Sequence, residues 1–372
     1  MEKHRIITLG VSNSGKTCFL ASMYQKLQVQ NQKIGFYLEA KPEIRKRLNN
    51  LWKDIADPNR LWPPGTQMQQ VQEWAFTCMI NSPQNKANYP VFEFVYWDYP
   101  GEYITHDPPD SENLAPAFDI ESKAKEADAL LVFVDGHKVL DVLRNKKQAL
   151  LRLKHDLNNL LPIVQKINFI PVHFIITKWD LLEKKFSLRE AQECLLQFEN
   201  FKDIVEQRRQ QKMPTRLIPI SAVGSDFAEL DANGEMQKNR NKIPKPFQIE
   251  MSLAFTLNDK FQALLNETQI NRIMKPWLPK KLKIEFFRFL ADAIDRVVPT
   301  TVKTLLIGTV LELIKGRVDK TLEELEREKD AAFEAVKNKQ TAIDSVLKSF
   351  NYLCATLETN FPESDLCRNG RL

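Results

Sequence analysis

The sequence predicts an α/β fold with a mainly parallel sheet, followed by an all-α C-terminal extension. Between residue 5 and about residue 221, short apolar runs of strand character alternate with amphipathic helical patterns, the order expected of β-α-β units. From about residue 267, charge-patterned helical spacing continues with no further strand signal. We therefore expect an α/β domain over residues 1–266, with insertions at about 30–60 and 226–245, and a helical extension over residues 267–372.

Composition and charge are those of an ordinary globular protein. Apolar residues make up 43% and charged residues 27% of the 372-residue chain, which is enough to build a core. The formal net charge of +5 is too small to indicate nucleic-acid binding by itself. The five cysteines are scattered without C-x-x-C spacing, so we expect reduced thiols and a cytoplasmic location. The longest apolar stretch, residues 305–314, contains Glu312 and is too short to span a membrane.

The first strand, loop and helix carry the most informative motif. Residues 5–9 predict a buried strand, residues 10–17 fit G-x-x-x-x-G-K-[ST], and residues 18–24 have helical spacing. Glycine lets successive backbone N–H groups of such a loop point inward, and the helix N-terminus adds its positive dipole end, so the loop binds phosphate. Lys16 would reach the β- and γ-phosphates, and the Thr17 hydroxyl would bind Mg²⁺. The alternative is a chance glycine turn before a helix.

Several residues of this loop are candidates for nucleotide contact. For Cys18 a lowered thiol pKa at the helix N-terminus is one interpretation, but a small buried side chain is favoured. The candidates are Gly10, Asn13, Ser14, Gly15, Lys16, Thr17 and Cys18.

A second motif follows a predicted hairpin. The elements leading to it are a strand at 35–40, an exposed helix at 42–55, a Pro-rich loop at 61–66, and strands at 71–80 and 91–97. The second hairpin strand ends in Asp98-Tyr99-Pro100-Gly101, which matches D-x-x-G. Asp98 would hold Mg²⁺ through water, and the Gly101 N–H would reach the γ-phosphate.

Two further motifs follow later strands. The elements here are a strand at 129–135, a long helix at 138–166, a strand at 169–177, a helix capped by Ser187, a last strand at 217–221, an inserted loop at 226–245 and a closing helix at 247–265. Thr177-Lys178-Trp179-Asp180 matches [NT]-K-x-D, and Ser221-Ala222 fits the S-A motif whose backbone touches the guanine carbonyl. All of these motifs follow the carboxyl ends of strands, where such sheets bind ligands.

The carboxylate of Asp180 carries the expected base selectivity. It can accept hydrogen bonds from both guanine N1–H and the exocyclic N2 amino group, while Lys178 lies along the base plane. Adenine has an acceptor at N1 and nothing at C2, so a buried carboxylate would stay unpaired, at a cost of about 1–3 kcal/mol or more. The motif therefore argues against an ATPase.

Together these motifs resemble those of a P-loop GTPase of the translation-factor-related class, over residue 1 to about residue 265. The Asp98–Glu102 box and the Trp62–Thr66 loop are similar to those of double-GTPase-like proteins of bacterial conflict systems. The resemblance implies a bacterial regulatory GTPase that binds GTP or GDP with Mg²⁺; it names no effector.

The resemblance also implies catalytic candidates. Thr66 is the expected switch threonine that binds Mg²⁺, with Thr77 as the fallback. Glu102 stands where small GTPases often place the water-orienting Gln, and its charge opposes the γ-phosphate, so intrinsic hydrolysis should be slow. Asn13 matches the Asn that helps bind K⁺ in potassium-activated GTPases; the alternative is that it only tolerates the loop's backbone angles. Thr177 departs from the usual Asn, which removes an amide that braces the phosphate loop.

The C-terminal region leaves several partners open. Residues 271–288 interleave basic and aromatic side chains, and packing on the domain is favoured over contact with a membrane surface or nucleic acid. Apolar spacing from Leu322 to Leu357 favours a helical hairpin against the domain over a self-associating coiled coil, which leaves the oligomeric state open, a dimer included. We expect a slow GTPase switch with a helical output module for a protein effector; the alternative is a nucleotide-gated scaffold or membrane- or partner-docking protein with negligible hydrolysis.

Overall fold

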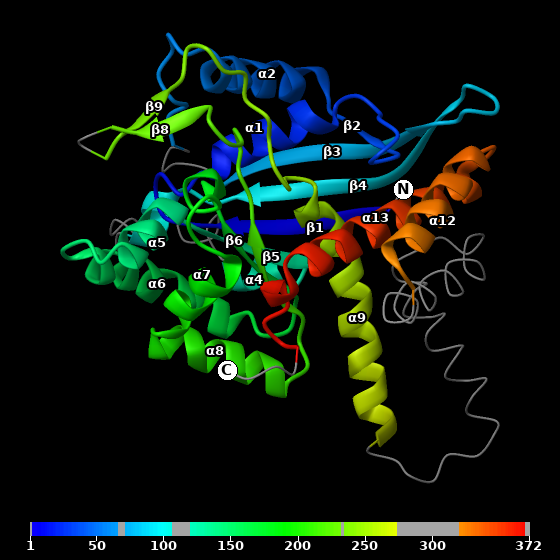
Figure 1. Ribbon diagram of the computed structural model, residues 1–372. Helices are drawn as coiled ribbons and strands as arrows, with labels where there is room; N and C mark the ends of the chain where they lie inside the picture. The colour runs from blue at the N-terminus through cyan, green and yellow to red at the C-terminus, as the bar shows by residue number, and fades with distance from the viewer. Residues whose placement is uncertain (1, 66–70, 106–119, 232–233, 274–319, 369–372) are drawn as a thin grey trace.

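The computed structural model describes residues 2–65, 71–105, 120–231, 234–273 and 320–368 (Figure 1). Its centre is a seven-stranded sheet with the order β2-β3-β4-β1-β5-β6-β7. Strand β3 runs antiparallel to β2 and β4, and the other neighbouring pairs are parallel. The expected α/β fold with a mainly parallel sheet is confirmed. The strands are β1 (Glu2–Leu9), β2 (Tyr37–Glu39), β3 (Gln72–Asn81), β4 (Asn88–Asp98), β5 (Ala129–Val134), β6 (Val172–Ile176) and β7 (Thr215–Pro219).

Helices cover both faces of the sheet. Because neighbouring strand residues point to opposite sides, Ile6 of β1 belongs to one hydrophobic cluster and Ile7 to the other. Helices α1, α9 and α13 contribute to the first cluster, and α5 to α8 to the second. The helices are α1 (Lys16–Leu27), α2 (Pro42–Ala56), α3 (Gly101–Thr105), α4 (Ile120–Ala124), α5 (Gly136–Leu143), α6 (Ala149–Lys166), α7 (Leu188–Leu196), α8 (Glu199–Gln210), α9 (Met251–Ile273), α12 (Leu322–Glu334), α13 (Lys339–Asn360) and the short 3₁₀ turns η2 (Trp179–Leu181) and η4 (Pro362–Ser364).

The single long helix predicted over residues 138–166 is wrong. The structure has two helices there, α5 and α6, because Asn145 and Gln148 adopt left-handed backbone angles, with φ of 53° and 62°. In the connecting turn the Lys146 ammonium lies 2.8 Å from the Asp141 carboxylate of α5. In the sequence, apolar residues keep a helical spacing across this turn. The pattern therefore does not reveal that the helix is interrupted between α5 and α6. By contrast, the predicted cap at Ser187 is confirmed, and it forms a capping box with Glu190.

The insertion at 226–245, expected to be a loop, contains a small hairpin. Strands β8 (Ala228–Leu230) and β9 (Met236–Lys238) pair antiparallel. The Asp231 carboxylate accepts a hydrogen bond of 2.9 Å from the Glu235 N–H, which closes the turn between them. Three-residue strands are too short to give an alternating pattern, so only the turn could be recognised. The insertion at 30–60 contains β2 and α2, near their predicted ranges.

The last two described helices form a hairpin against the sheet. Helix α13 packs against α12 and shares the first hydrophobic cluster (red and orange in Figure 1). The Phe350 ring of α13 lies 5.0 Å from Phe36 and 6.2 Å from Phe94 of β4, measured between ring centroids. The helical hairpin packed against the domain, which the apolar spacing favoured over a self-associating coiled coil, is therefore the arrangement observed. Helix α9 crosses the expected boundary at residues 266–267 without a break, and the division into two domains stays a prediction.

Lys329 of α12 interrupts the apolar seam of the hairpin, and its charge is satisfied inside it. Only 3% of the residue is exposed. Its Nζ donates to the carbonyls of Gln32 and Lys33 at 3.3 and 3.2 Å and lies 4.7 Å from the ring centroid of Tyr352. The lysine therefore fixes the hairpin to the loop before β2.

The basic and aromatic segment begins at the end of α9. Most of the basic and aromatic segment at 271–288 lies outside the described residues, so its packing or membrane contact stays open. Within the described ranges, no helix combines the length and apolar character needed to cross a bilayer.

Candidate nucleotide-binding site

The loop between β1 and α1 has the shape that its motif predicts. Gly15 has a φ of 93° and Asn13 a φ of 64°, both left-handed. A Cβ atom at Gly10 would lie 2.6 Å from Ser14 Oγ and 2.8 Å from Phe133 Cβ, so a side chain does not fit there. These angles curl the loop in front of the N-terminus of α1, which begins at Lys16.

Two polar side chains inside the curl have the chemistry of a phosphate site. Ser14 is 1% exposed, and its hydroxyl has no hydrogen-bond partner among the described residues. A buried hydroxyl without a partner is costly, and a phosphate oxygen could accept its proton. The Lys16 Nζ donates to the Gly10 carbonyl at 2.5 Å. Burial lowers the pKa of Lys16, and the Asp98 carboxylate opposes that shift. A phosphate group fits both side chains.

The end of β4 lies directly against this loop. Asp98 is fully buried and accepts a hydrogen bond of 3.2 Å from the Thr8 hydroxyl of β1. Three residues further on, a Cβ atom at Gly101 would lie 2.3 Å from the Ser12 backbone nitrogen. Only glycine allows this approach, so the second motif packs on the first. The Thr17 hydroxyl and the Asp98 carboxylate are oxygen ligands of the kind that Mg²⁺ prefers.

Asp180, at the end of the [NT]-K-x-D turn, has one carboxylate oxygen in use and one without a partner. Its Oδ1 accepts a hydrogen bond of 2.5 Å from the Ser221 hydroxyl, and its Oδ2 has no partner among the described residues. The residue is 8% exposed. Burial raises the pKa of Asp180 to about 6, although the Ser221 hydrogen bond opposes the shift. A buried acceptor of this kind suits a ligand that brings N–H donors.

Lys178 and Thr177 connect this turn to the end of β5, and Thr177 also lies beside the phosphate loop. Lys178 has a left-handed φ of 51°, and its Nζ lies 2.9 Å from the Asp135 carboxylate at the end of β5. The Thr177 hydroxyl donates to the Val134 carbonyl at 3.2 Å, and its methyl carbon lies 3.5 Å from where a Cβ on Gly15 would be. Thr177 therefore touches the phosphate loop without a hydrogen bond to it, as the departure from Asn predicts.

Ser221 organises the loop after β7. While its hydroxyl donates to Asp180, its oxygen accepts from the backbone N–H groups of Val223 and Gly224 at 3.2 and 2.7 Å. Ala222 is partly buried beside this turn. The last strand ends at Pro219, two residues earlier than predicted, so Ser221 and Ala222 lie in the loop rather than in the strand. The four motifs thus meet at one edge of the sheet.

The remaining candidate residues are Cys18 of the phosphate loop and the three catalytic candidates outside it. Burial raises the pKa of Cys18 to about 11, although Lys178 and Lys238 lower it, so the lowered thiol pKa that was one interpretation is wrong. Glu102 is exposed in the first turn of α3. Thr66 lies outside the described residues, and its switch role stays a prediction. Thr77, the fallback, pairs with Glu93 in the middle of β3.

Two residues that support the site, Asp135 and Lys238, were not among the predicted site residues. Asp135 holds Lys178 and also caps α5, where it accepts from the His137 N–H at 2.9 Å. Lys238 of β9 donates to the carbonyls of Asp57 and Arg60 at 3.1 and 2.8 Å and lies 4.6 Å from the Trp62 ring centroid. Asp135 comes directly after an apolar strand, which is a usable signal. Lys238 depends on contacts between segments far apart in the sequence, so it has none.

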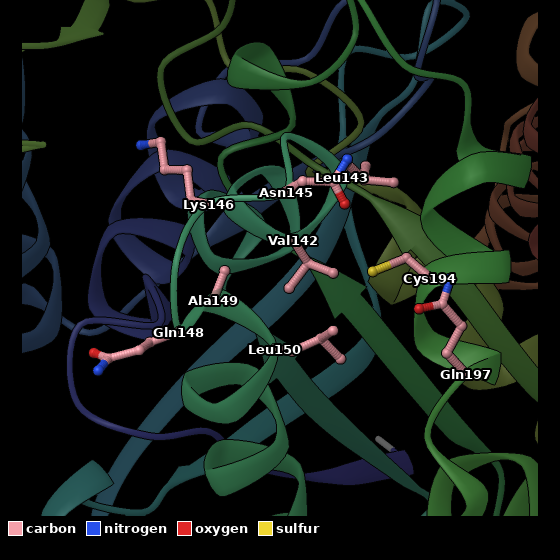
Figure 2. Close-up of a pocket in the computed structure, with 9 residues that line it drawn as sticks. All are labelled: Val142, Leu143, Asn145, Lys146, Gln148, Ala149, Leu150, Cys194 and Gln197. Atoms are coloured by element: carbon pink, nitrogen blue, oxygen red, sulfur yellow. The ribbon is translucent and has the colours of Figure 1, made fainter.

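A separate pocket of about 360 Å³ lies between α5, the turn before α6, and α7 (Figure 2). None of the residues that line it belongs to the four motifs. It is lined by Val142, Leu143, Asn145, Lys146, Gln148, Ala149, Leu150, Cys194 and Gln197. We do not assign the nucleotide to this pocket, because it lacks the glycine loop and the buried carboxylate.

Comparison with known proteins agrees with the geometry. The sequence model of the family described as Double-GTPase 2 matches residues 4–226, which is more than half of the chain and includes all four motifs. The curated proteins that were compared gave no match. The expected resemblance to double-GTPase-like P-loop proteins is confirmed, and a guanine nucleotide is the ligand that this family implies. The chain therefore belongs to the Double-GTPase 2 family.

Proposed function

We propose that this protein binds GTP with Mg²⁺ and hydrolyses it slowly, as a regulatory switch. The observation that carries the proposal is the buried Asp180 Oδ2, which has no partner among the described residues and lies in the turn that touches the phosphate loop. Guanine supplies two N–H donors for a carboxylate, whereas adenine supplies none at these positions. Lys178, held by Asp135, would lie along the base.

The remaining roles divide between phosphate and metal. Ser14, Lys16 and the backbone N–H groups of the loop would bind the phosphates. Thr17, Asp98 and Thr66 would hold Mg²⁺, which supplies positive charge against the phosphate oxygens when bound. The exposed Glu102 at the start of α3 would face the γ-phosphate side and, as a carboxylate, it cannot donate to that phosphate. Slow unaided hydrolysis follows from this side chain.

Hydrolysis gives the first prediction. Unaided turnover of GTP should be at or below about 10⁻² s⁻¹. Lys16→Ala should lose nucleotide binding, whereas Thr66→Ala should mainly lose hydrolysis. Lys147→Ala, which removes an exposed lysine from the turn before α6, is the matched control and should change neither. Single-turnover assays with γ-labelled GTP measure the rate, and a value near about 1 s⁻¹ without a partner would contradict the slow switch.

The same assay separates two further hypotheses. Complete absence of phosphate release would favour the alternative, a nucleotide-gated scaffold, for which the charge of Glu102 is the supporting observation.

Equal rates of GTP hydrolysis in KCl and NaCl would exclude K⁺ as a cofactor at Asn13. The left-handed φ of 64° already accounts for an Asn at this position without a cation.

The raised pKa of Asp180 predicts that GTP affinity depends on pH. Guanine needs the ionised carboxylate, so protonation of the free protein competes with binding. Affinity should be nearly constant above about pH 7 and should fall, by up to about tenfold per pH unit, as the pH drops below the pKa of about 6. The Ser221 hydrogen bond lowers this pKa, so Ser221→Ala should move the midpoint of the profile to higher pH. The substitution leaves the pKa of the γ-phosphate of GTP unchanged. A shift of the midpoint between the two proteins would therefore report the pKa of Asp180. An identical profile in both proteins would count against the assignment of Asp180.

The biological setting is part of the proposal. We propose that the protein acts in the cytoplasm, in a bacterial defence or stress system, and that its C-terminal helices serve as the output module for a protein effector. The support is the family and the packing of α13 on the sheet that carries the site. Proteins that co-purify with a GTP-locked form, but not with the GDP form, would identify the effector; the same set in both forms would argue against a switch.

A further inference from the structure

The segment that follows α13 reaches the guanine-recognition turn. Phe361 is the C-cap residue directly after α13, and its ring lies 6.3 Å from the ring of Trp179, between centroids, with an interplanar angle of 82°. Trp179 stands between Lys178 and Asp180 and is 2% exposed. An edge-to-face pair of this kind is a favourable aromatic contact. A residue near the C-terminus therefore packs on the side chain between the two base-recognition residues.

The same segment is attached to the strand that leads to Ser221. The Leu366 N–H donates to the Thr215 carbonyl of β7 at 3.0 Å, and Asp365 forms an antiparallel bridge with Arg216. Beyond the end of β7, the Trp179 N–H donates to the Ile220 carbonyl at 3.0 Å. Both guanine-recognition elements are thus joined to each other and to residues 361–366.

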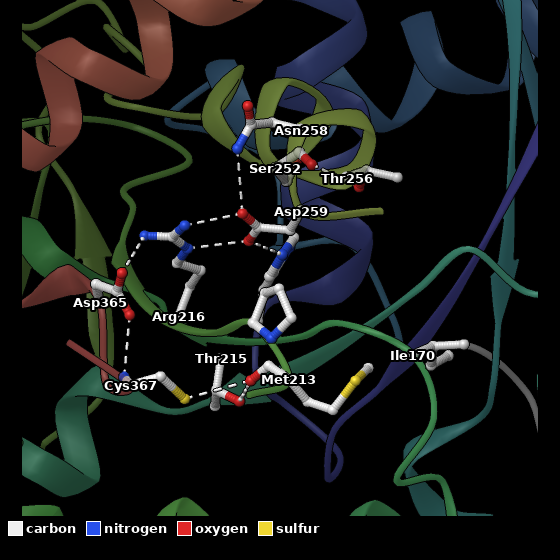
Figure 3. A network of polar contacts seen from close by, with 12 residues as sticks. Ile170, Met213, Thr215, Arg216, Ser252, Thr256, Asn258, Asp259, Asp365 and Cys367 are labelled. Atoms are coloured by element: carbon white, nitrogen blue, oxygen red, sulfur yellow. Dashed lines mark hydrogen bonds and ion pairs between the residues drawn. The ribbon is translucent and has the colours of Figure 1, made fainter. Parts of the chain in front are cut away.

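A buried ion network anchors this attachment (Figure 3). The Arg216 guanidinium, 2% exposed, makes two hydrogen bonds to Asp259 of α9, at 2.8 and 2.9 Å. Its third nitrogen lies 2.8 Å from Glu358 of α13 and 3.1 Å from Asp365. The end of α13 is therefore held in one position relative to β7. Phe361 follows only three residues after Glu358, so the network also fixes where the Phe361 ring meets Trp179.

We propose that Phe361 is a positioning residue for guanine recognition: it holds Trp179, and through it the Asp180 carboxylate, in the orientation that the base requires. The inference rests on the proposed function. The turn that Phe361 supports is short and strained, with a left-handed Lys178 before a single 3₁₀ turn. Burial of Trp179 adds to the hydrogen bonds that Asp180 and the Trp179 N–H make with residues 220 and 221 in holding this turn. The family match ends at residue 226, so this inference adds a residue from outside the matched part of the chain to the nucleotide site.

Phe361→Ala in the full-length protein tests the proposal. Loss of the ring should weaken GTP binding by about five- to tenfold, the size of a lost aromatic pair. The diagnostic readout is the ratio of the dissociation constants for ITP and GTP. Hypoxanthine lacks the 2-amino group that one carboxylate oxygen would accept from, so the ratio reports the alignment of Asp180. Misalignment should reduce the ratio toward one, whereas a general loss of folded protein would weaken both nucleotides equally. Phe361→Tyr, which keeps the ring, should restore both values.

Leu366→Ala is the matched control. Leu366 is 1% exposed in the same segment, and its backbone bond to Thr215 does not depend on its side chain. It should lower thermal stability while leaving the ratio unchanged. The proposal is overturned if Phe361→Ala keeps the wild-type ratio, or if Leu366→Ala changes the ratio as much. If the unmodified protein itself does not prefer GTP over ITP, the proposed function fails instead, so the two failures are distinguishable.

Discussion

Replacing Asp180 with asparagine should lower GTP affinity by about 10²- to 10⁴-fold and raise the affinity for XTP. A carboxylate that accepts two hydrogen bonds from guanine contributes about 3–6 kcal/mol, at 1.5–3 kcal/mol for each bond to a charged group. The asparagine amide offers one donor and one acceptor. Xanthine carries a carbonyl at C2 in place of the amino group. This carbonyl can accept a hydrogen bond from the asparagine amide but not from the aspartate carboxylate.

Equilibrium titration with fluorescent GTP and XTP analogues measures both changes. Asp203→Asn, on the exposed face of α8, makes the same chemical change away from the site and should leave both affinities as they are. If Asp180→Asn kept GTP affinity within about threefold, the carboxylate would not read the base and the assignment of this turn would fail.

Replacing Arg216 with methionine should destabilise the protein by about 3–5 kcal/mol. The change leaves Asp259, which is fully buried, without the guanidinium that pairs with both of its oxygens. His173 remains at 3.0 Å from Asp259. Burial lowers the pKa of His173 and so disfavours a charged imidazole, although the neighbouring Asp259 opposes this shift. The Asn258 amide also remains, donating to Asp259 Oδ1 at 3.2 Å. These two contacts do not replace the two charge-assisted bonds from Arg216.

The loss should depend on pH with a definite sign. Burial by itself would raise the pKa of Asp259, but Arg216 and His173 bring it below its ordinary value. Its contribution is therefore present above about pH 4 and is lost as the pH falls. Without Arg216 the pKa should rise, so the difference between wild type and variant should shrink in acid.

Urea unfolding at pH 7.5 and at about pH 3.5, below the ordinary pKa of an aspartate, measures this difference. Arg60→Met removes an arginine whose ion pair with Asp54 is exposed, and it should cost less than about 1 kcal/mol. The double change Arg216→Met with Asp259→Leu removes the uncompensated charge and should recover part of the stability. Equal losses for Arg216→Met and Arg60→Met would mean that the buried network does not hold α9 and α13 to β7.

The nucleotide motifs could be predicted from the sequence because their chemistry is local. The left-handed angles that Gly15 and Asn13 adopt belong to an eight-residue pattern. Asp98 is the last residue of the apolar strand β4, and Asp180 ends the Thr177–Asp180 motif that follows the apolar strand β6. Parallel strands bring those carboxyl ends together at one edge of the sheet. The order of the elements was therefore enough to place the four motifs near each other.

The contacts that support the site depend on residues far apart in the chain. Arg216 and Asp259 are 43 residues apart, and Glu358 is 142 residues from Arg216. No periodicity links such positions, since each residue fits its own helix or strand. Phe361 looks like one more apolar residue of a helical seam, and its contact with Trp179 follows only from the packing of α13. The break between α5 and α6 was missed for a related reason: Asn145 and Gln148 do not interrupt helical spacing.

Competition between GTP and ATP for the full-length protein tests the central claim most directly. The reporter is a fluorescent GDP analogue bound in the presence of Mg²⁺, displaced by each unlabelled nucleotide at pH 7.5. The account predicts that GTP displaces it with a dissociation constant at least about 100-fold lower than that of ATP, because only guanine supplies donors to the buried Asp180 oxygen. Equal displacement by GTP and ATP would contradict it.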